Sequence, residues 1–302
     1  MNRDPKRPAF AAVTVALLAW SLGPIHIRML TPYFDQYTIN VVRYEVAAAP
    51  LLLASLIWFR DDLFKLFRSW RMMGTLVALT IVMQMVWTAG IYGSTANLSQ
   101  LITKISVVFT IGIAWFVFRD EREVIRDPRF VLGVVLSFAG LVMVMAKEPG
   151  SLAPVFDTAA WFLIATAVLW AIYNVWSKYL VETTAHPIPL FGVQSFYAGL
   201  GFLPFALLFG DPGSMFDLSA KMATIAVLSG LLPLGIAHPC YNYAQMHLGA
   251  SYCGTLVLFT PAGTYLLSAI FLPEESLRPL QLAGAGVLIL GTVAVTLAHR
   301  RV

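Results

Sequence analysis

The sequence predicts an all-α, polytopic membrane protein with ten transmembrane helices arranged as two inverted five-helix repeats. Three observations support this: an excess of apolar residues, ten long apolar segments, and a weak similarity between the two halves of the chain. Of the 302 residues, 59% are apolar and 12% are charged, and the mean hydropathy is +0.76. A soluble domain has about twice that charged fraction, so we expect the apolar excess to face lipid.

Each of the ten segments approaches the roughly 20 apolar residues that a membrane-spanning helix needs. They cover residues 9–30, 37–59, 72–93, 95–118, 129–146, 157–180, 189–209, 220–246, 249–272 and 279–298. Their apolar runs are too long and too continuous for the strands of a membrane barrel. The first segment is longer than a signal-peptide core and no small-residue cleavage site follows it, so we interpret it as the first span.

A basic amphipathic stretch, residues 60–71, separates the second and third segments. Its apolar side chains share one helical face: Leu63, Leu66, Phe67 and Trp70. Basic side chains surround that face, which is typical of a helix lying in the lipid headgroup region. A solvated linker is the alternative.

The distribution of basic residues predicts the orientation of the chain. Fourteen of the 20 Lys and Arg residues fall on one side of the expected membrane, four fall on the other, and two lie within spans. The positive-inside rule assigns the richer side to the cytoplasm. We therefore expect a multi-pass protein of the inner (plasma) membrane with cytoplasmic N- and C-termini.

The two halves of the chain resemble each other weakly. Residues 20–30 align with residues 170–180, and a seven-residue step separates two glycines near the end of each half. These glycines are Gly133 and Gly140 in the first half and Gly284 and Gly291 in the second. We predict two five-helix units, 1–148 and 149–302, of which the second is inverted because five is odd. Transporters built this way bind substrate near the midplane between the repeats; chance similarity of apolar sequences is the alternative.

Several short motifs, in order, resemble those of the drug/metabolite transporter superfamily, EamA family. Val41-Val42-Arg43-Tyr44 is similar to the family's Arg-aromatic pattern in the second helix, and Thr260-Pro261 to its Thr-Pro pair in the ninth. Pro273-Glu274-Glu275-Ser276, with the two glycines that follow, resembles the family's Gly-Glu-Arg…Gly…Gly ending. Val107 departs from the pattern, since the first half would carry a proline there. The resemblance covers nearly the whole chain and implies a ten-helix transporter, among relatives that include amino-acid exporters.

Three charged residues lie inside the predicted spans and away from their ends, in the hydrocarbon region: Arg43, Glu45 and Lys104. Such groups are costly in hydrocarbon and tend to face a cavity or a partner. We expect Glu45 and Lys104 to lie near the midplane and to form an ion pair on the substrate path, for which a zwitterion competes. A proton bound by Glu45 and a static, purely structural pair are the alternatives. Arg43 is expected to cap helix ends or to snorkel to water.

Aromatic and polar side chains within the spans complete the candidate substrate site. The predicted substrate-binding residues are Trp20, Glu45, Gln84, Trp87, Gln100, Lys104, Trp170, Tyr173, Asn174, His238, Asn242 and Tyr252. Rings stack on flat substrates or hold cations, although Trp and Tyr also anchor helices at the membrane surface. Buried amides and imidazoles equally serve helix–helix hydrogen bonds, and His238 is also a candidate proton carrier. Prolines within the spans, among them Pro24 and Pro233, free backbone groups that need other partners.

These observations favour a secondary transporter that exports small metabolites, with amino acids, including aromatic ones, as candidates, by alternating access around a central cavity. The sequence has no Walker motif, so a gradient must drive transport, and a proton is the candidate coupling ion. A uniporter, or a channel-like permease for another small organic solute, is the alternative. An enzyme is not predicted, because no HExxH, GxSxG or paired intramembrane aspartates occur. The two cysteines and the clustered basic loops predict neither a cofactor or metal nor a nucleic-acid partner.

Overall fold

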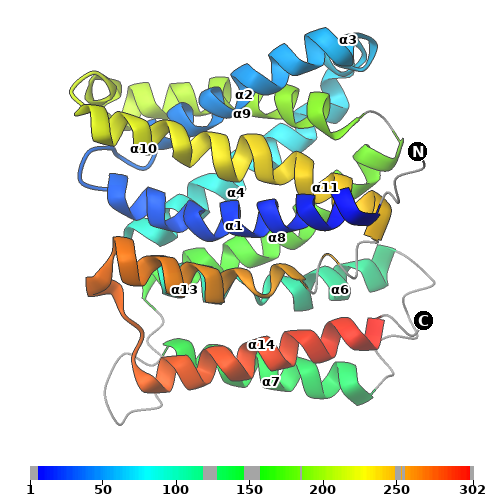
Figure 1. Ribbon diagram of the computed structural model, residues 1–302, viewed down its shortest axis with the longest axis vertical. Coiled ribbons are helices and arrows are strands. Elements are labelled where there is room, and N and C mark those ends of the chain that lie inside the picture. Colours follow the sequence, from blue (N-terminus) through cyan, green and yellow to red (C-terminus); the bar gives the residue numbers. More distant parts are fainter. Residues whose placement is uncertain are drawn as a thin grey trace.

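The protein is seen in a computed structural model that describes residues 6–117, 128–145, 157–183, 186–248, 253 and 256–299. These residues form helices joined by short connections. The helices stack side by side along the long axis of the molecule, and the first residues of α1 and the last residues of α14 lie at the same end of the helices (Figure 1). The predicted all-α class is confirmed.

The helices follow one another with few long connections. In the N-terminal half they are α1 (Lys6–Leu30), α2 (Thr38–Trp58), α3 (Arg60–Arg68), α4 (Trp70–Tyr92), α5 (Ala96–Thr103), α6 (Ser106–Val117) and α7 (Pro128–Met145). In the C-terminal half they are α8 (Thr158–Thr183), α9 (Pro187–Phe209), η2 (Pro212–Met215), α10 (Ala220–Gly230), η3 (Leu231–Ile236), α11 (Ala237–Leu248), α13 (Thr260–Phe271), η4 (Pro273–Glu275) and α14 (Pro279–His299).

Seven helical stretches of the described chain are long and apolar enough to cross a membrane. They are Arg7–Leu30, Thr38–Trp58, Trp70–Tyr92, Pro128–Met145, Thr158–Ser177, Pro187–Phe209 and Ala220–Leu248. The other three predicted spans correspond to shorter helices: the α5–α6 pair, the 12-residue α13 and the apolar stretch Pro279–Ala294 of α14. The multi-span character is therefore confirmed, and the count of ten stays a prediction.

Apolar side chains cover the outside of the bundle as well as its interior. Leu208, Ile270 and Leu290, on three different helices, are 74%, 72% and 66% exposed. An exposed apolar surface of this kind marks contact with lipid or with another protein. Combined with the long apolar helices, it indicates that these faces lie against the bilayer.

Two of the predicted spans are interrupted helices. Between α5 and α6, the amides of Lys104 and Ile105 donate to the carbonyls of Leu101 and Ile102, which lie three residues back instead of four. Between α10 and α11 the chain forms the π-helical segment η3, which contains Pro233. Proline lacks the N–H that would continue the ladder, and π-helical turns occur frequently at functional sites.

The stretch predicted to be an interfacial helix forms α3, which ends at Arg68; its place at the membrane surface stays a prediction. Its apolar face differs from the prediction, because Leu63 and Leu66 are buried in a cluster with residues of α2, α4 and α9. Trp70 begins α4 instead and is 69% exposed. The apolar face of α3 therefore packs on the protein, and this packing positions α3 beside α9.

The repeated glycines lie where α7 and α14 pack along each other (Figure 1). A Cβ atom added at Gly284 would lie 2.6 Å from Met143 Cβ and 2.9 Å from the backbone nitrogen of Val144. A Cβ atom added at Gly291 would lie 2.5 Å from the backbone nitrogen of Ser137. Real Cβ atoms do not approach other atoms so closely, so the seven-residue glycine step provides the room for this helix contact.

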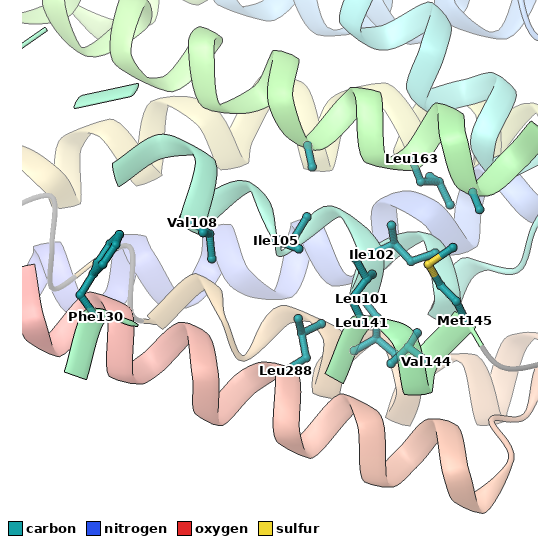
Figure 2. Packing of buried hydrophobic residues seen from close by; sticks show 12 residues of the cluster. Leu101, Ile102, Ile105, Val108, Phe130, Leu141, Val144, Met145, Leu163 and Leu288 are labelled. Carbon is teal, nitrogen blue, oxygen red and sulfur yellow. The ribbon is translucent and has the colours of Figure 1, made fainter. Parts of the chain in front are cut away.

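The α7–α14 pair is attached to the rest of the bundle through an apolar core. Residues of α5, α6, α7, α8 and α14 meet there. In Figure 2, Leu288 of α14 and Leu141 of α7 lie below Leu163 of α8 and below Ile105, which stands in the break between α5 and α6. Ile105 and Leu163 are completely buried. This core fixes the break between α5 and α6 against α8.

The packing of the helices is itself repeated. Helix α4 packs on α8 as α11 packs on α1, and α6 packs on α8 as α13 packs on α1. The pairs α2–α9 and α7–α14 join helices that occupy the same place in each half. Exchanging the two halves therefore reproduces the pattern of contacts, as a two-fold axis between them would. The proposed unit boundaries, 1–148 and 149–302, stay a prediction.

Candidate functional site

The turn of α1 that contains Pro24 is connected directly to the broken helix of the second half. Pro24 has no N–H, so the Trp20 carbonyl four residues back lacks its helical partner. The Gln100 side chain of α5 donates to that carbonyl at 3.0 Å. The Trp20 indole in turn donates to the Pro233 carbonyl of η3 at 3.0 Å. The prediction that in-span prolines free backbone groups for other partners is thus met here, and Trp20 joins α1, α5 and η3.

Four aromatic rings surround the buried imidazole of His238. The ring centroids of Trp20 and Phe191 lie 5.3 Å and 5.0 Å from that of His238. Those of Trp170 and Tyr173 lie 6.2 Å and 6.3 Å away. We call these five residues, from α1, α8, α9 and α11, the ring cluster. The cluster joins both halves of the chain, and the imidazole nitrogens make no hydrogen bond to other described residues.

Hydrogen bonds on adjacent helices hold the ring cluster in place. The Gln194 amide of α9 donates to the Tyr173 hydroxyl at 3.1 Å and to the Thr80 hydroxyl of α4 at 2.9 Å. The Asn242 amide donates to the His238 carbonyl, one turn earlier on α11, at 3.0 Å. Gln194 and Asn242 therefore make structural contacts in this conformation.

Arg43 lies beside the same broken helix and is completely buried. Pro233 leaves the Ser229 carbonyl without its helical donor, and Arg43 Nε donates to that carbonyl at 3.2 Å. Arg43 Nη1 donates to Asn40 Oδ1 at 3.4 Å, and Nη2 is buried without a hydrogen-bond partner. The guanidinium carbon lies 5.4 Å from the centre of the Trp87 ring. The expectation that Arg43 snorkels to water is wrong, because short contacts from α2, α4 and α10 enclose it.

Polar groups on α4 lie near this arginine. The hydroxyl of Thr88 and the side chain of Asn40 bond to each other, and so connect α4 to α2 beside Arg43. Gln84 is one helical turn from Thr88 on the same face of α4. It is 2% exposed, and its Oε1 atom has no hydrogen-bond partner. The Trp87 ring, which lies over Arg43, also lies 4.0 Å from a Cβ atom built at Gly23 of α1.

The structure does not form the predicted ion pair between Glu45 and Lys104. Glu45 lies against Gly199 of α9, and its Oε1 atom is buried without a hydrogen-bond partner. Lys104 lies in the break between α5 and α6. In Figure 1, α1 lies between α2, the helix of Glu45, and α6, so α1 separates the helix of Glu45 from the break. Among the described residues the ion pair present joins Arg28 and Glu275. Depth along a helix predicted the pairing, but depth does not determine which neighbour a side chain faces.

The remaining predicted residues fall into two groups. Asn174 is half-buried on α8, one residue after Tyr173, and its amide makes no hydrogen bond to the described residues. Tyr252 lies outside the described residues. The sequence analysis did not identify Phe191, because an apolar residue near the start of a span looks like any other lipid-facing or core residue. It also undervalued Arg43, although the four-residue step from Pro233 to Ser229 predicts a freed carbonyl for a donor to approach.

Comparison with known proteins agrees with this architecture. The model of the EamA-like transporter family matches residues 7–146 and again residues 157–297. An "Uncharacterized transporter" of Archaeoglobus fulgidus is 26% identical over 87% of this chain and 89% of its own length. One of Clostridium kluyveri is 24% identical over 72% of this chain and 68% of its own.

A solved crystal structure shares the fold. It superposes with a TM-score of 0.68 at 16% identity and covers 97% of this chain and 98% of its own. The two family matches fall on the two halves that contribute to the ring cluster. The chain is a multi-pass membrane protein and belongs to the EamA-like transporter family.

Proposed function

We propose that the protein is a secondary transporter of the inner membrane that exports small metabolites, with aromatic amino acids as the first candidates. The supporting observation is the ring cluster, because its rings come from α1 in one matched half and from α8, α9 and α11 in the other. A site shared between inverted halves changes its access when the halves rock against each other. Aromatic rings around one point also suit a flat substrate.

A proton gradient is the proposed driving force. Glu45 and His238 are the candidate proton carriers, since the Glu45 Oε1 atom is buried without a hydrogen-bond partner and the His238 imidazole is buried at the centre of the ring cluster. Facilitated diffusion, by a uniporter or a channel-like permease, is the alternative. In either case the proposed activity is movement of a solute and not chemical conversion. Both termini are proposed to face the cytoplasm, and in this orientation Arg28 and Glu275 lie toward the outer side of the membrane.

Replacing His238 by alanine is expected to lower export of the substrate by about tenfold or more, because it opens the centre of the ring cluster and removes its titratable group. The measurement is efflux of phenylalanine and tryptophan from preloaded cells that overproduce the protein, normalised to the amount in the membrane. His247→Ala is the matched control, since His247 is exposed on the same helix. Equal efflux from the two variants would contradict a substrate site at the ring cluster.

A further inference from the structure

The guanidinium of Arg43 is a buried charge that the described chain does not balance. Its side chain is completely buried, and the ion pair among the described residues lies elsewhere, between Arg28 and Glu275. Glu45 follows two residues later on α2 but faces α9, where it lies against Gly199. A buried charge without a counter-ion costs several kcal/mol or more, roughly as estimated for broken buried ion pairs. A protein that keeps such a charge gains from a ligand that neutralises it.

The contacts of Arg43 hold the guanidinium in one orientation and leave one nitrogen unused. Nε donates to the Ser229 carbonyl and Nη1 to the Asn40 side chain, whereas Nη2 has no partner. The planar guanidinium matches the geometry of a carboxylate and pairs with it more strongly than with neutral acceptors. The Trp87 ring lies over the same group, at 5.4 Å.

The other titratable groups near Arg43 supply no negative charge that would balance the guanidinium. The imidazoles of His26 and His238 both lie within electrostatic reach of the guanidinium. The His26 Nδ1 atom is buried without a hydrogen-bond partner. Tyr44 and Tyr92, the other groups that interact with the charge, are neutral phenols at physiological pH. The region therefore favours an anion over a cation.

We propose that Arg43 binds the carboxylate of the transported substrate, which makes the substrate an organic acid or an amino acid and not an amine or an alcohol. This inference rests on the proposed function. Nη2 is enclosed in the conformation seen here, so the carboxylate reaches it in a conformation in which the contact with Trp87 opens. From Arg43 the path leads along η3 to the ring cluster, because Pro233 contacts Trp20 and follows Ser229 by one turn.

The test is a binding comparison on the purified, full-length protein with four probes that share a phenyl ring: phenylpyruvate, phenylalanine, phenethylamine and phenylethanol. The wild-type protein is expected to bind the two carboxylates and to bind the amine and the alcohol at least about tenfold more weakly. Arg43→Met should lower the affinity for phenylpyruvate by about 10- to 100-fold and leave that for phenylethanol unchanged. Arg43→Lys keeps the positive charge but lacks the planar guanidinium. Its affinity for phenylpyruvate should lie between those of the wild type and Arg43→Met.

Lys221→Met is the matched control, since it removes an exposed positive charge at the start of α10. It is expected to bind all four probes as the wild type does. Preference of the wild type for phenethylamine, binding of none of the probes, or unchanged phenylpyruvate affinity in Arg43→Met overturns the proposal. If the Arg43 variants do not fold, the wild-type ranking decides. Binding is measured without transport, so carboxylate binding without efflux from cells would defeat the proposed function and leave the anion site standing.

Discussion

Replacing Gly284 by alanine is expected to lower the free energy of unfolding by about 1–3 kcal/mol, the usual range for overpacking a close contact. The added Cβ would meet Met143 Cβ at 2.6 Å and the backbone nitrogen of Val144 at 2.9 Å. The contacts belong mostly to the α7 backbone and not to a flexible side-chain end, so the helices must move apart. Thermal unfolding of the protein in detergent measures the effect.

Gly286, two residues later on α14, supplies a control of opposite sign. No atom lies within 4 Å of a Cβ atom built there. Alanine in a helix is favoured over glycine by roughly 0.5–1 kcal/mol, so Gly286→Ala should leave stability unchanged or raise it. Two variants of equal stability would show that α7 and α14 do not pack as closely as described.

Replacing Glu275 by glutamine is expected to lower the free energy of unfolding by about 1.5–3 kcal/mol, the range for a hydrogen bond to a charged group. Glu275 Oε1 accepts from Arg28 Nε at 2.6 Å, and Oε2 accepts from the backbone nitrogen of Ala96 at 2.6 Å. The Asn97 amide donates to the Glu275 carbonyl at 2.8 Å. The neutral variant weakens the bonds that join α1, α5 and η4, and unfolding in detergent again measures the loss.

The neighbouring Glu274 provides the matched change, because it is exposed and lies in the same short helix. Glu274→Gln should alter stability by less than about 0.5 kcal/mol. A double-mutant cycle with Arg28→Met isolates the ion pair, since coupled residues show non-additive effects. Additive effects of the Arg28 and Glu275 changes would contradict a direct interaction between them.

The sequence was sufficient to predict features that depend on periodicity and on local chemistry. Long apolar runs predicted the helices. The glycine step indicated the repeat, and in the structure Gly284 and Gly291 lie at close helix contacts. The repeat of Trp20 and Trp170 indicated a shared location, and both rings lie beside His238. These signals work because each follows from the backbone or from a single helix face.

Features that depend on which helix neighbours which were not predictable in the same way. Glu45 and Lys104 were assigned to one depth, but the first faces α9 and the second lies in a helix break. The π-helical segment η3 and the burial of Arg43 against it also depend on tertiary packing. A single sequence gives depth along each span and does not give rotation about the helix axis.

The most direct test of the central claim, a carrier with one site shared by the two halves, is counterflow in proteoliposomes. Vesicles containing the purified protein are preloaded with unlabelled phenylalanine, and uptake of labelled phenylalanine is compared with that of empty vesicles. In a carrier with one site that opens to either side in turn, the site returns to the outside faster when unlabelled phenylalanine from the inside occupies it. Preloading should therefore accelerate uptake of labelled phenylalanine several-fold. Uptake that is equal with and without preloading would contradict the account and favour a channel-like pore.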